Sequence, residues 1–209
     1  MTKTINLLAI SVLTVAFAML TTSALADAAI FFKVEGAPPG DSTVPGRGDG
    51  WVAADDFSFG IDKELKKKFQ KGGTEDLNIG LGELQEVIMS KSLDRTSAYL
   101  AQHAINGNSV GSVEICFVGQ VGSEVERCYL HYKLDRCFIK SWSTSGDAND
   151  IPIEEVAFYY NKIAFAYTPE GENTPEPSNI MSWDNVKNIT WNVVFDPIIE
   201  LLFPQGNSK

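Results

Sequence analysis

The sequence has few of the side chains from which most catalytic and metal sites are built: its 209 residues include two histidines and three cysteines. His103 and His131 have no cysteine or second histidine at the spacing of a zinc site. The chain also lacks a G-x-S-x-G sequence and a glycine-rich phosphate loop ahead of a helix. Cys128 and His131 are three residues apart on an expected strand, so their side chains point to opposite faces and do not form a nucleophilic pair. We therefore predict a protein that is not an enzyme, with no cofactor and no bound metal.

Basic side chains are also few: Lys and Arg number 17 against 27 Asp and Glu, a formal net charge of −10 at pH 7. A chain this acidic repels nucleic acid and anionic lipid, so neither is an expected partner. Five lysines nevertheless crowd one segment, for which Asp62 could cap a brief helix: Lys63, Lys66, Lys67, Lys68 and Lys71. The segment is either a solvated helix face or loop, or a contact for an acidic surface on a neighbouring copy.

The only long apolar run lies at the N-terminus. Lys3 is followed by apolar residues over 7–20 and then by Ala24-Leu25-Ala26, which together are the three parts of a secretory signal peptide. The run is short for a bilayer span, which needs about 20 apolar residues; a retained anchor is the alternative. We expect cleavage after Ala26 and a bacterial protein that is periplasmic or secreted. Removing residues 1–26 loses one Lys and no acid, which leaves 183 residues, enough for one domain, with a net charge of −11.

The remaining sequence is mainly β in character, with one convincing helix over about residues 94–106. Side chains suited to capping a helix start stand at Asp94, Thr96 and Ser97, and Gly107 supplies the stop. Small and apolar residues fall on one helical face, where they can sit close against a sheet: Ser97, Leu100, Ala101 and Ala104. The predicted fold class is a β-barrel or sandwich with this helix laid on it.

Strands are expected where apolar and polar residues alternate or where β-branched and aromatic residues gather. The expected strands include 30–34, 113–117, 127–134, 138–144, 155–167 and 189–196. Both faces of the segment 155–167 are apolar, so it should be covered on both sides, with another subunit as one source of that cover. Beyond Pro197, a short apolar run over 198–203 must pack or remain exposed.

The cysteines can form a disulfide in an oxidising compartment. If Cys116 stood directly opposite Cys128, Ile115 would face Tyr129. Shifting the pairing by one residue puts Ile115 opposite Cys128, which gathers the apolar groups on one face and sends Cys116 to the other. We therefore favour a hairpin without a bond between Cys116 and Cys128. Because Cys137 is the third cysteine, at least one is free or bonded between chains.

The order of five motifs gives a further indication. The first is a strand ending in glycine, Ile30–Gly36, and the second is a short aromatic strand, Phe57–Gly60. The third, Met89–Leu100, contains a Lys-x-x-Asp-x-x-Ser run entering the helix. The fourth, Ser141–Gly146, has Ser-Thr-Ser-Gly after a strand, and the fifth, Ile189–Asn192, is a closing Trp-Asn strand. In this order, over nearly all of the chain after residue 26, they resemble the haemolysin-coregulated protein (Hcp) family of type VI secretion.

The resemblance implies an Hcp-like β-barrel of two sheets with one flanking helix over residues 27–197, followed by a tail over 198–209. It also implies that six copies form a ring, that rings stack into a tube, and that the tube meets a spike protein and can shelter small effectors. Family members are not enzymes. The signal peptide departs from the pattern, because the family's ordinary tube polymerises in the cytoplasm.

Two functions remain open from the sequence. The first is an exported, non-enzymatic Hcp-like protein, of the type VI secretion and virulence class, that assembles into rings or tubes through barrel edges, its long loop and the lysine-rich segment. The second keeps the fold but makes it an exported monomeric binding module for a host or envelope partner outside any type VI machine.

Overall fold

The computed structural model describes residues 29–41, 50–63, 65–67, 77–79, 82–120, 126–169, 171–172 and 174–195. The expected signal peptide over 1–26 and the expected tail over 198–209 lie outside these residues. Within the described ranges, no helix has the length and apolar character that a membrane span requires.

The described elements are mostly strands. In chain order the strands are β1 (Ala29–Val34), β2 (Val52–Ala54), β3 (Asp56–Ser58), β4 (Ile61–Asp62), β5 (Leu65–Lys67), β6 (Leu77–Ile79), β7 (Glu83–Leu84), β8 (Val87–Ser92), β9 (Gly111–Gln120), β10 (Glu126–Ser145), β11 (Ile153–Tyr159), β12 (Lys162–Tyr167) and β13 (Ile180–Asp184). Helix α1 (Ser97–Asn106) lies between β8 and β9, and the 3₁₀ turn η1 (Pro177–Asn179) precedes β13. The expected strands at 30–34, 113–117, 127–134 and 138–144 all fall within these elements.

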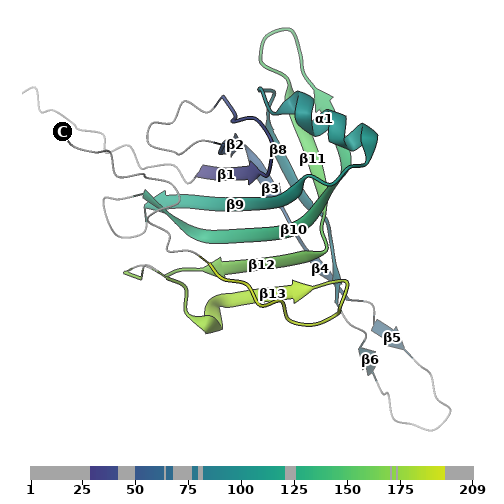
Figure 1. The fold of residues 1–209 in the computed structure, drawn as a ribbon, viewed down its shortest axis with the longest axis vertical. Helices are drawn as coiled ribbons and strands as arrows, with labels where there is room; N and C mark the ends of the chain where they lie inside the picture. The colour runs from purple at the N-terminus through teal and green to yellow at the C-terminus, as the bar shows by residue number, and fades with distance from the viewer. Residues whose placement is uncertain are drawn as a thin grey trace, which may run out of the picture.

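The main strands form two antiparallel sheets that share β10 (Figure 1). The first sheet has the order β2-β1-β9-β10-β12-β13, and the second has the order β3-β8-β11-β10. Strand β10 passes from the first sheet to the second near Arg136, which has a φ of 55° and lies at a shift in the pairing register. The turn expected at residues 135–136 is thus a bend within one 20-residue strand.

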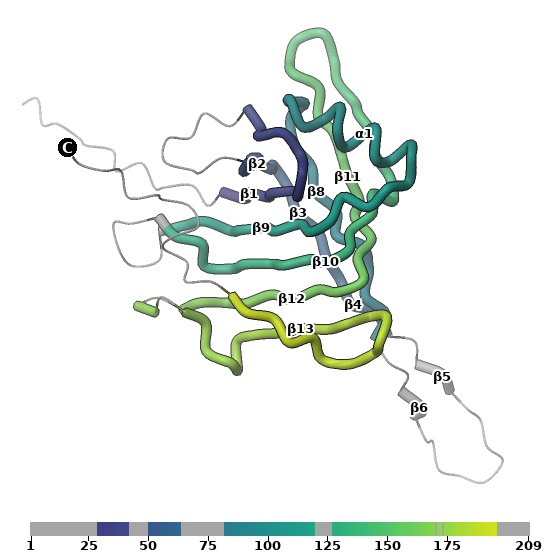
Figure 2. Tube along the Cα trace, viewed as in Figure 1, coloured from purple at the N-terminus to yellow at the C-terminus, as the bar shows by residue number. Residues whose placement is uncertain are grey.

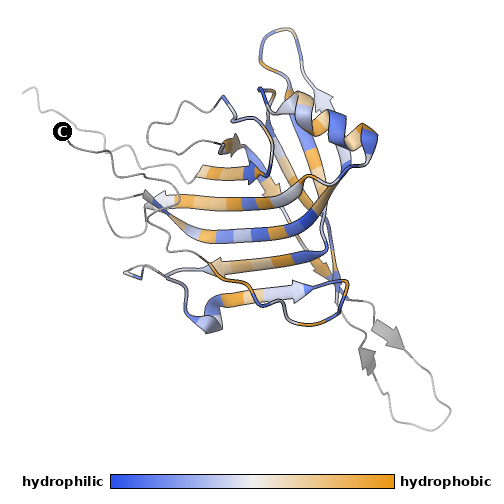
Figure 3. Ribbon diagram, in the orientation of Figure 1, coloured by the Kyte–Doolittle hydropathy of each residue, from blue (hydrophilic) through white to orange (hydrophobic). Residues whose placement is uncertain are grey.

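The core lies between the facing sides of the two sheets. We call these the inner faces and the opposite sides the outer faces. Alternate residues of each strand supply the core because successive side chains point to opposite faces. Strand β9 is coloured as hydrophobic along most of its length (Figure 3), because its outer-face residues Cys116 and Val118 are apolar as well. Fully buried members include Phe32, Val113 and Ile115 from the first sheet and Met89 and Phe158 from the second. Over the part of the chain that the structure describes, this arrangement of two main sheets and one α-helix confirms the predicted fold class.

Helix α1 flanks the barrel and ends where the sequence predicts. Leu100 is fully buried in the core, so this face of the helix packs inward. Gly107 follows the last turn with a left-handed φ of 68°, and its N–H donates to the His103 carbonyl at 3.1 Å. Glycine adopts this conformation without the steric cost that a side chain would bring. The helix begins at Ser97, slightly later than the expected residue 94.

The single strand expected over 155–167 is wrong. The segment forms β11 and β12, which pair with different halves of β10 and are joined at residues 160–161. The Tyr160 hydroxyl donates to the Gln85 carbonyl at 2.6 Å, and the Asn161 N–H donates to the Asp135 carbonyl at 3.1 Å. Strand β11 turns even-numbered residues such as Val156 and Phe158 inward, whereas β12 turns odd-numbered residues such as Ile163 inward. Apolar residues at both even and odd positions therefore face the core.

The strand expected over 189–196 is also wrong in its described part. The last strand in the described residues is β13, after which Ile189 makes one isolated bridge to Asp184. Residues 190–195, which we call the C-terminal strap, belong to no strand and run back across the first sheet (Figure 2). The alternation of Trp191, Val193 and Phe195 is real, since all three are half-buried, but it reflects packing on a sheet face instead of pairing at a sheet edge.

Candidate functional site

A buried ion cluster joins the start of α1 to the second sheet. Lys91 in β8 stands opposite Glu154 in β11, and both side chains are almost completely buried, at 1% and 0% exposure. The Lys91 ammonium lies 2.7 Å from Glu154 Oε1 and donates to Asp94 Oδ1 at the same distance. The Trp142 indole N–H from β10 donates to Glu154 Oε2 at 2.8 Å. Side chains from β8, the segment that enters α1, β10 and β11 therefore meet at one buried charge.

The cluster explains the Lys-x-x-Asp-x-x-Ser run. The Ser97 hydroxyl accepts the Asp94 N–H at 2.9 Å, while the Thr96 N–H and hydroxyl both donate to Asp94 Oδ1. Lys91 also donates to the Ser92 carbonyl at 2.9 Å. Asp94 and Ser97 do shape the helix entry, as expected, although the hydrogen bonds form a turn before the helix instead of a regular cap.

Electrostatics favour a charged Asp94. Burial alone would raise its pKa, but hydrogen bonds from Lys91 and Thr96 outweigh burial and hold the pKa of Asp94 below its ordinary value. A carboxylate here and one at Glu154 flank a single ammonium, so the arrangement fixes the relative positions of β8, β11 and α1. The cluster is therefore a structural feature that holds these elements together.

Sequence reasoning found Asp94 and Ser97 as helix-capping residues and Lys91 only through the family resemblance, and it missed Glu154 and Trp142. A local signal for Glu154 does exist. It lies in phase with Val156 and Phe158, two fully buried residues of the same strand, so it occupies a core-facing position. An acid in such a position requires a partner.

The lysine-rich segment forms part of a two-stranded arm. Strand β5 pairs with β6, with Lys66 opposite Asn78, and β4 pairs with β7. The arm extends away from the two sheets (Figure 1). Lys63 is exposed, and Lys66 and Lys67 lie in β5, whereas Lys68 and Lys71 lie outside the described residues. The helix expected from residue 63 is wrong where the chain is described, because residues 65–67 pair as a strand.

The two histidines lie in different elements, α1 and β10, and each has its own neighbours. His103 on α1 contacts the Tyr99 carbonyl through Nδ1 at 2.9 Å, and the two rings lie 4.1 Å apart. His131 is buried on the outer face of the first sheet, with Nε2 3.0 Å from Glu114 Oε2. The hydrogen bond from His131 lowers the pKa of Glu114 against the opposing effect of burial. Within the described ranges, no group of three or more His, Cys, Asp or Glu residues is placed to hold a metal ion.

The C-terminal strap covers the outer face around His131. The Phe195 ring meets the His131 ring edge to face at 5.3 Å, and the Lys133 ammonium donates to the Val194 carbonyl at 3.0 Å. Lys162 lies 5.3 Å from the centre of the Trp191 ring, a cation–π contact. The sequence predicts that both sides of this segment are covered. The strap covers the outer side of β12 with residues of the same chain.

The cysteine prediction is wrong, since Cys116 and Cys128 form a disulfide with a Cα–Cα distance of 5.6 Å. The cause is a β-bulge. Val118 pairs with Cys128 and Phe117 pairs with Leu130, which leaves Tyr129 as an extra residue. The bulge turns Cys128 to the outer face, where Cys116 already points, whereas strict alternation would keep Cys128 on the same face as Leu130.

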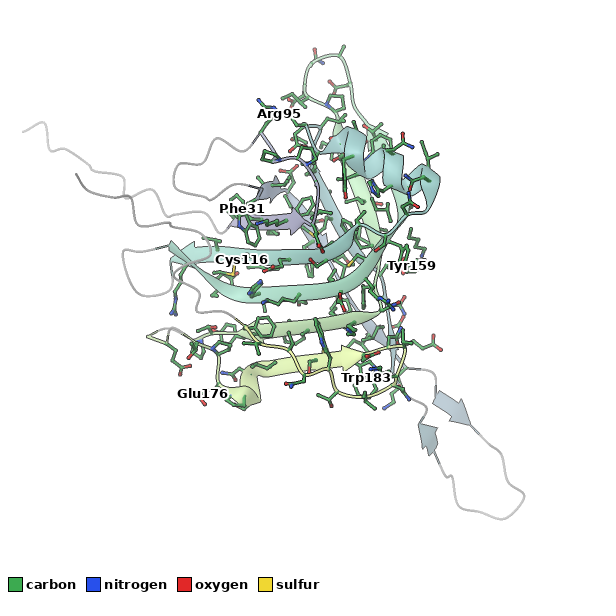
Figure 4. The ribbon with its side chains drawn as sticks, in the orientation of Figure 1. Phe31, Arg95, Cys116, Tyr159, Glu176 and Trp183 are labelled. Atoms are coloured by element: carbon green, nitrogen blue, oxygen red, sulfur yellow. A yellow bond between two sulfur atoms is a disulfide. The ribbon has the colours of Figure 1, made fainter. Side chains whose placement is uncertain are left out.

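The outer face of the second sheet carries large apolar side chains that are exposed. Phe138 and Tyr159 are paired across β10 and β11 and are 39% and 51% exposed, and Ile153 at the start of β11 is 50% exposed. Tyr159 lies on the side of the barrel opposite Phe31 and Cys116 (Figure 4). The Lys140 ammonium lies 5.1 Å from the Tyr159 ring centre and 2.7 Å from Glu86.

A family model described as type VI secretion system effector, Hcp, matches residues 31–167, from β1 to the end of β12. Among proteins with curated descriptions, none matches the sequence.

Solved structures with the same fold include one described as a type six secretion system protein, at 22% identity, a TM-score of 0.65, and coverage of 79% of this chain and 100% of that one. Hcp1 from Salmonella typhimurium is 15% identical with a TM-score of 0.56 and the same coverage. The secreted protein Hcp3 from Pseudomonas aeruginosa is 18% identical, with a TM-score of 0.52 and coverage of 76% and 99%. At these identities the likeness concerns the fold.

Proposed function

Because the chain belongs to the Hcp family of type VI secretion system proteins, we propose that it is a non-catalytic structural subunit that is exported and assembles into rings. The family match over residues 31–167 carries this proposal, since it spans the barrel itself. Six copies to a ring, stacking of rings, and association with a spike protein or small effectors are the assembly states that membership favours.

The outer face of the second sheet supports self-association. A sheet face that exposes Phe138, Ile153 and Tyr159 is typical of a protein–protein contact surface. Replacing Tyr159 by Ser should therefore weaken assembly, whereas replacing Tyr167, 46% exposed at the end of β12, should not. Sedimentation of both variants checks this, and equal sedimentation of the two would exclude Tyr159 from the contact.

The lysine-rich arm is the second proposed contact, through Lys63, Lys66, Lys67, Lys68 and Lys71. Its charge is opposite to the net charge of the chain, so an acidic surface on a neighbouring copy suits it. The test variant replaces Lys63, Lys66 and Lys67 by Ser. The matched control replaces three other basic residues by Ser, all exposed and outside both proposed contacts: Lys33, Arg95 and Lys187. Both lower the net charge by three, and only the arm variant should lose assembly.

Export is the third part of the proposal. The N-terminal sequence supports a signal peptide that is cleaved after Ala26, and a disulfide suits an oxidising compartment. Mass spectrometry of the protein recovered from the periplasm and the medium should give a mature chain beginning at Asp27. A protein confined to the cytoplasm with residues 1–26 attached would contradict export.

A monomeric, exported binding module is the second candidate, and the C-terminal strap favours it. The strap covers the outer face around His131 with residues of the same chain, which removes that face from contact with another copy. The arm variant separates the two functions. Lost assembly supports the ring, whereas an unchanged monomer that no longer binds an envelope or host partner supports the module.

A further inference from the structure

The disulfide lies in a small apolar cluster of its own, separate from the barrel core. Cys116 and Cys128 are both fully buried on the outer face of the first sheet, together with Val118, Phe31 and Trp51. Cys116 stands opposite Phe31 of β1, and the two lie side by side in Figure 4. Once β1 and Trp51 are in place, neither sulfur is open to a reagent in solution. The bond must therefore form before this outer cluster closes.

The third cysteine is kept out of the reaction by its position and its chemistry. Cys137 is fully buried in the barrel core, on the other side of the first sheet from the disulfide. Burial is the main cause that raises the pKa of the Cys137 thiol to about 12. Because the thiolate is the attacking species in disulfide exchange, Cys137 is inert in the folded chain at neutral pH. One pair and one silent thiol account for the odd number of cysteines.

Sequence distance also favours the observed pair during folding. Cys116 and Cys128 are 12 residues apart on the two strands of one hairpin, so they approach each other as soon as β9 and β10 pair. The β-bulge at Tyr129 is what brings Cys128 to the face of Cys116. The bond and the bulge therefore support each other: the bulge aligns the two thiols, and the bond then keeps the bulge in register.

We propose that this chain is a substrate of a thiol oxidase, a protein whose reactive group is itself a disulfide, and that Cys116 and Cys128 are the pair it oxidises. One thiolate of the chain attacks the disulfide of the oxidase, which forms a mixed disulfide and releases one oxidase thiolate. The second chain thiolate then attacks the chain sulfur of that mixed disulfide and releases the other oxidase thiolate. The chain loses two electrons and two protons, and the oxidase disulfide is reduced to a dithiol.

The location of the reaction rests on the export proposed above. In a reducing cytoplasm the hairpin remains unlinked, and closing a loop of this length by a disulfide changes the folding equilibrium by roughly a hundredfold. The unlinked chain is thus the less stable form, and lower stability suits passage of an unfolded chain through an export channel. The linked chain forms where a thiol oxidase is present.

The test follows the reaction on purified full-length protein, so it does not depend on export. Denatured, reduced chain is diluted into buffer with a purified, oxidised periplasmic-type thiol oxidase, and disulfides are mapped by mass spectrometry without reduction. We expect one linkage, Cys116 to Cys128, with Cys137 unmodified until the chain is denatured. Without the oxidase, in buffer free of oxidants, we expect three free thiols and, by urea unfolding, a folding equilibrium constant roughly a hundredfold smaller.

Variants with single cysteines removed identify the reacting thiols. Cys116→Ala or Cys128→Ala should trap a mixed disulfide between the chain and the oxidase, because the partner needed for release is missing. The double variant, folded before the oxidase is added, should trap none because Cys137 is buried in the core. Cys137→Ala should form the native linkage at the normal rate.

Three results would overturn the proposal: no mixed disulfide with either single variant, a mixed disulfide through Cys137 in the folded double variant, or three free thiols after incubation with the oxidase. Export is measured separately by cell fractionation. A chain found outside the cytoplasm with three free thiols would overturn the oxidase relationship and leave the proposed export standing.

Discussion

Replacing Lys91 by Met should lower the unfolding free energy of the barrel by about 3–5 kcal/mol, the usual cost of removing one partner from a buried ion pair. The Lys91 side chain is 1% exposed, and its ammonium lies 2.7 Å from a carboxylate oxygen of both Asp94 and Glu154. Methionine nearly fills the same space without a charge. The variant therefore leaves the fully buried Glu154 with the Trp142 indole N–H but without its cation.

Urea unfolding followed by tryptophan fluorescence measures the loss. With a urea dependence of about 2 kcal/mol per molar for a domain of this size, the unfolding midpoint should fall by about 2 M. The matched control is Lys140→Met, because Lys140 makes an ion pair of the same 2.7 Å length with Glu86 but is 37% exposed. Exposed ion pairs contribute little, so this midpoint should hardly move.

A double variant separates the loss of the ion pair from the loss of packing. Changing Glu154 to Gln in the Lys91→Met chain removes the uncompensated charge and should restore a large part of the lost stability. A Lys91→Met variant that loses no more unfolding free energy than Lys140→Met would contradict the role of the buried ion pair. A double variant no more stable than Lys91→Met would contradict it as well.

Three further predictions concern the pKa of one group, the strap and the end of the helix. The folded-state pKa of Asp94 lies below the ordinary value of 3.8, so its carboxylate stabilises the fold above that pH and loses its effect as the pH falls through the lowered pKa. The stability difference between the wild type and Asp94→Asn in urea titrations should thus shrink in acid, and a difference that persists in strong acid would contradict the sign. Trp191→Ala and Phe195→Ala should each cost about 1 kcal/mol and speed proteolysis of the strap, because each removes a cation–π contact; Asn192→Ala, exposed between them, should do neither. Gly107→Ala should lower the unfolding free energy by about 1 kcal/mol in thermal unfolding, because its φ is 68°. No atom lies within 4 Å of the added Cβ, so the cost is conformational alone, and a more stable variant would refute this.

Local signals predicted the helix and most strands because the relevant physics is local. Gly107 provides the left-handed end of α1, and Leu100 marks the buried face, both within one helix. The fold class followed from strand alternation and from the order of motifs that resembles one family. None of these inferences needed the pairing of distant strands.

Pairing is where the sequence misled. The bulge at Tyr129 reverses the faces of Cys128 and the residues before it, and a single extra residue leaves no mark in an alternating pattern. Likewise, alternation over 191–195 indicates that one side is covered without telling a strand from a strap on a sheet face. The segment 65–67 follows Asp62, a residue suited to capping a helix, but it pairs with β6, a contact that only the fold supplies.

Only part of the buried ion cluster could be predicted from the sequence, for the same reason. Lys91 and Asp94 were visible as a motif, but the burial of the lysine depends on Glu154, which lies 63 residues away in the sequence and directly opposite in the sheet. Whether a lysine is solvated or buried is decided by the element that packs over it.

Analytical ultracentrifugation of the mature protein recovered from the culture medium, with electron microscopy of the same sample, tests the central claim most directly. The account predicts a species several times the mass of one chain and particles that are rings with an open centre. A sharp monomer boundary up to the highest soluble concentration, with no ring particles, would contradict it.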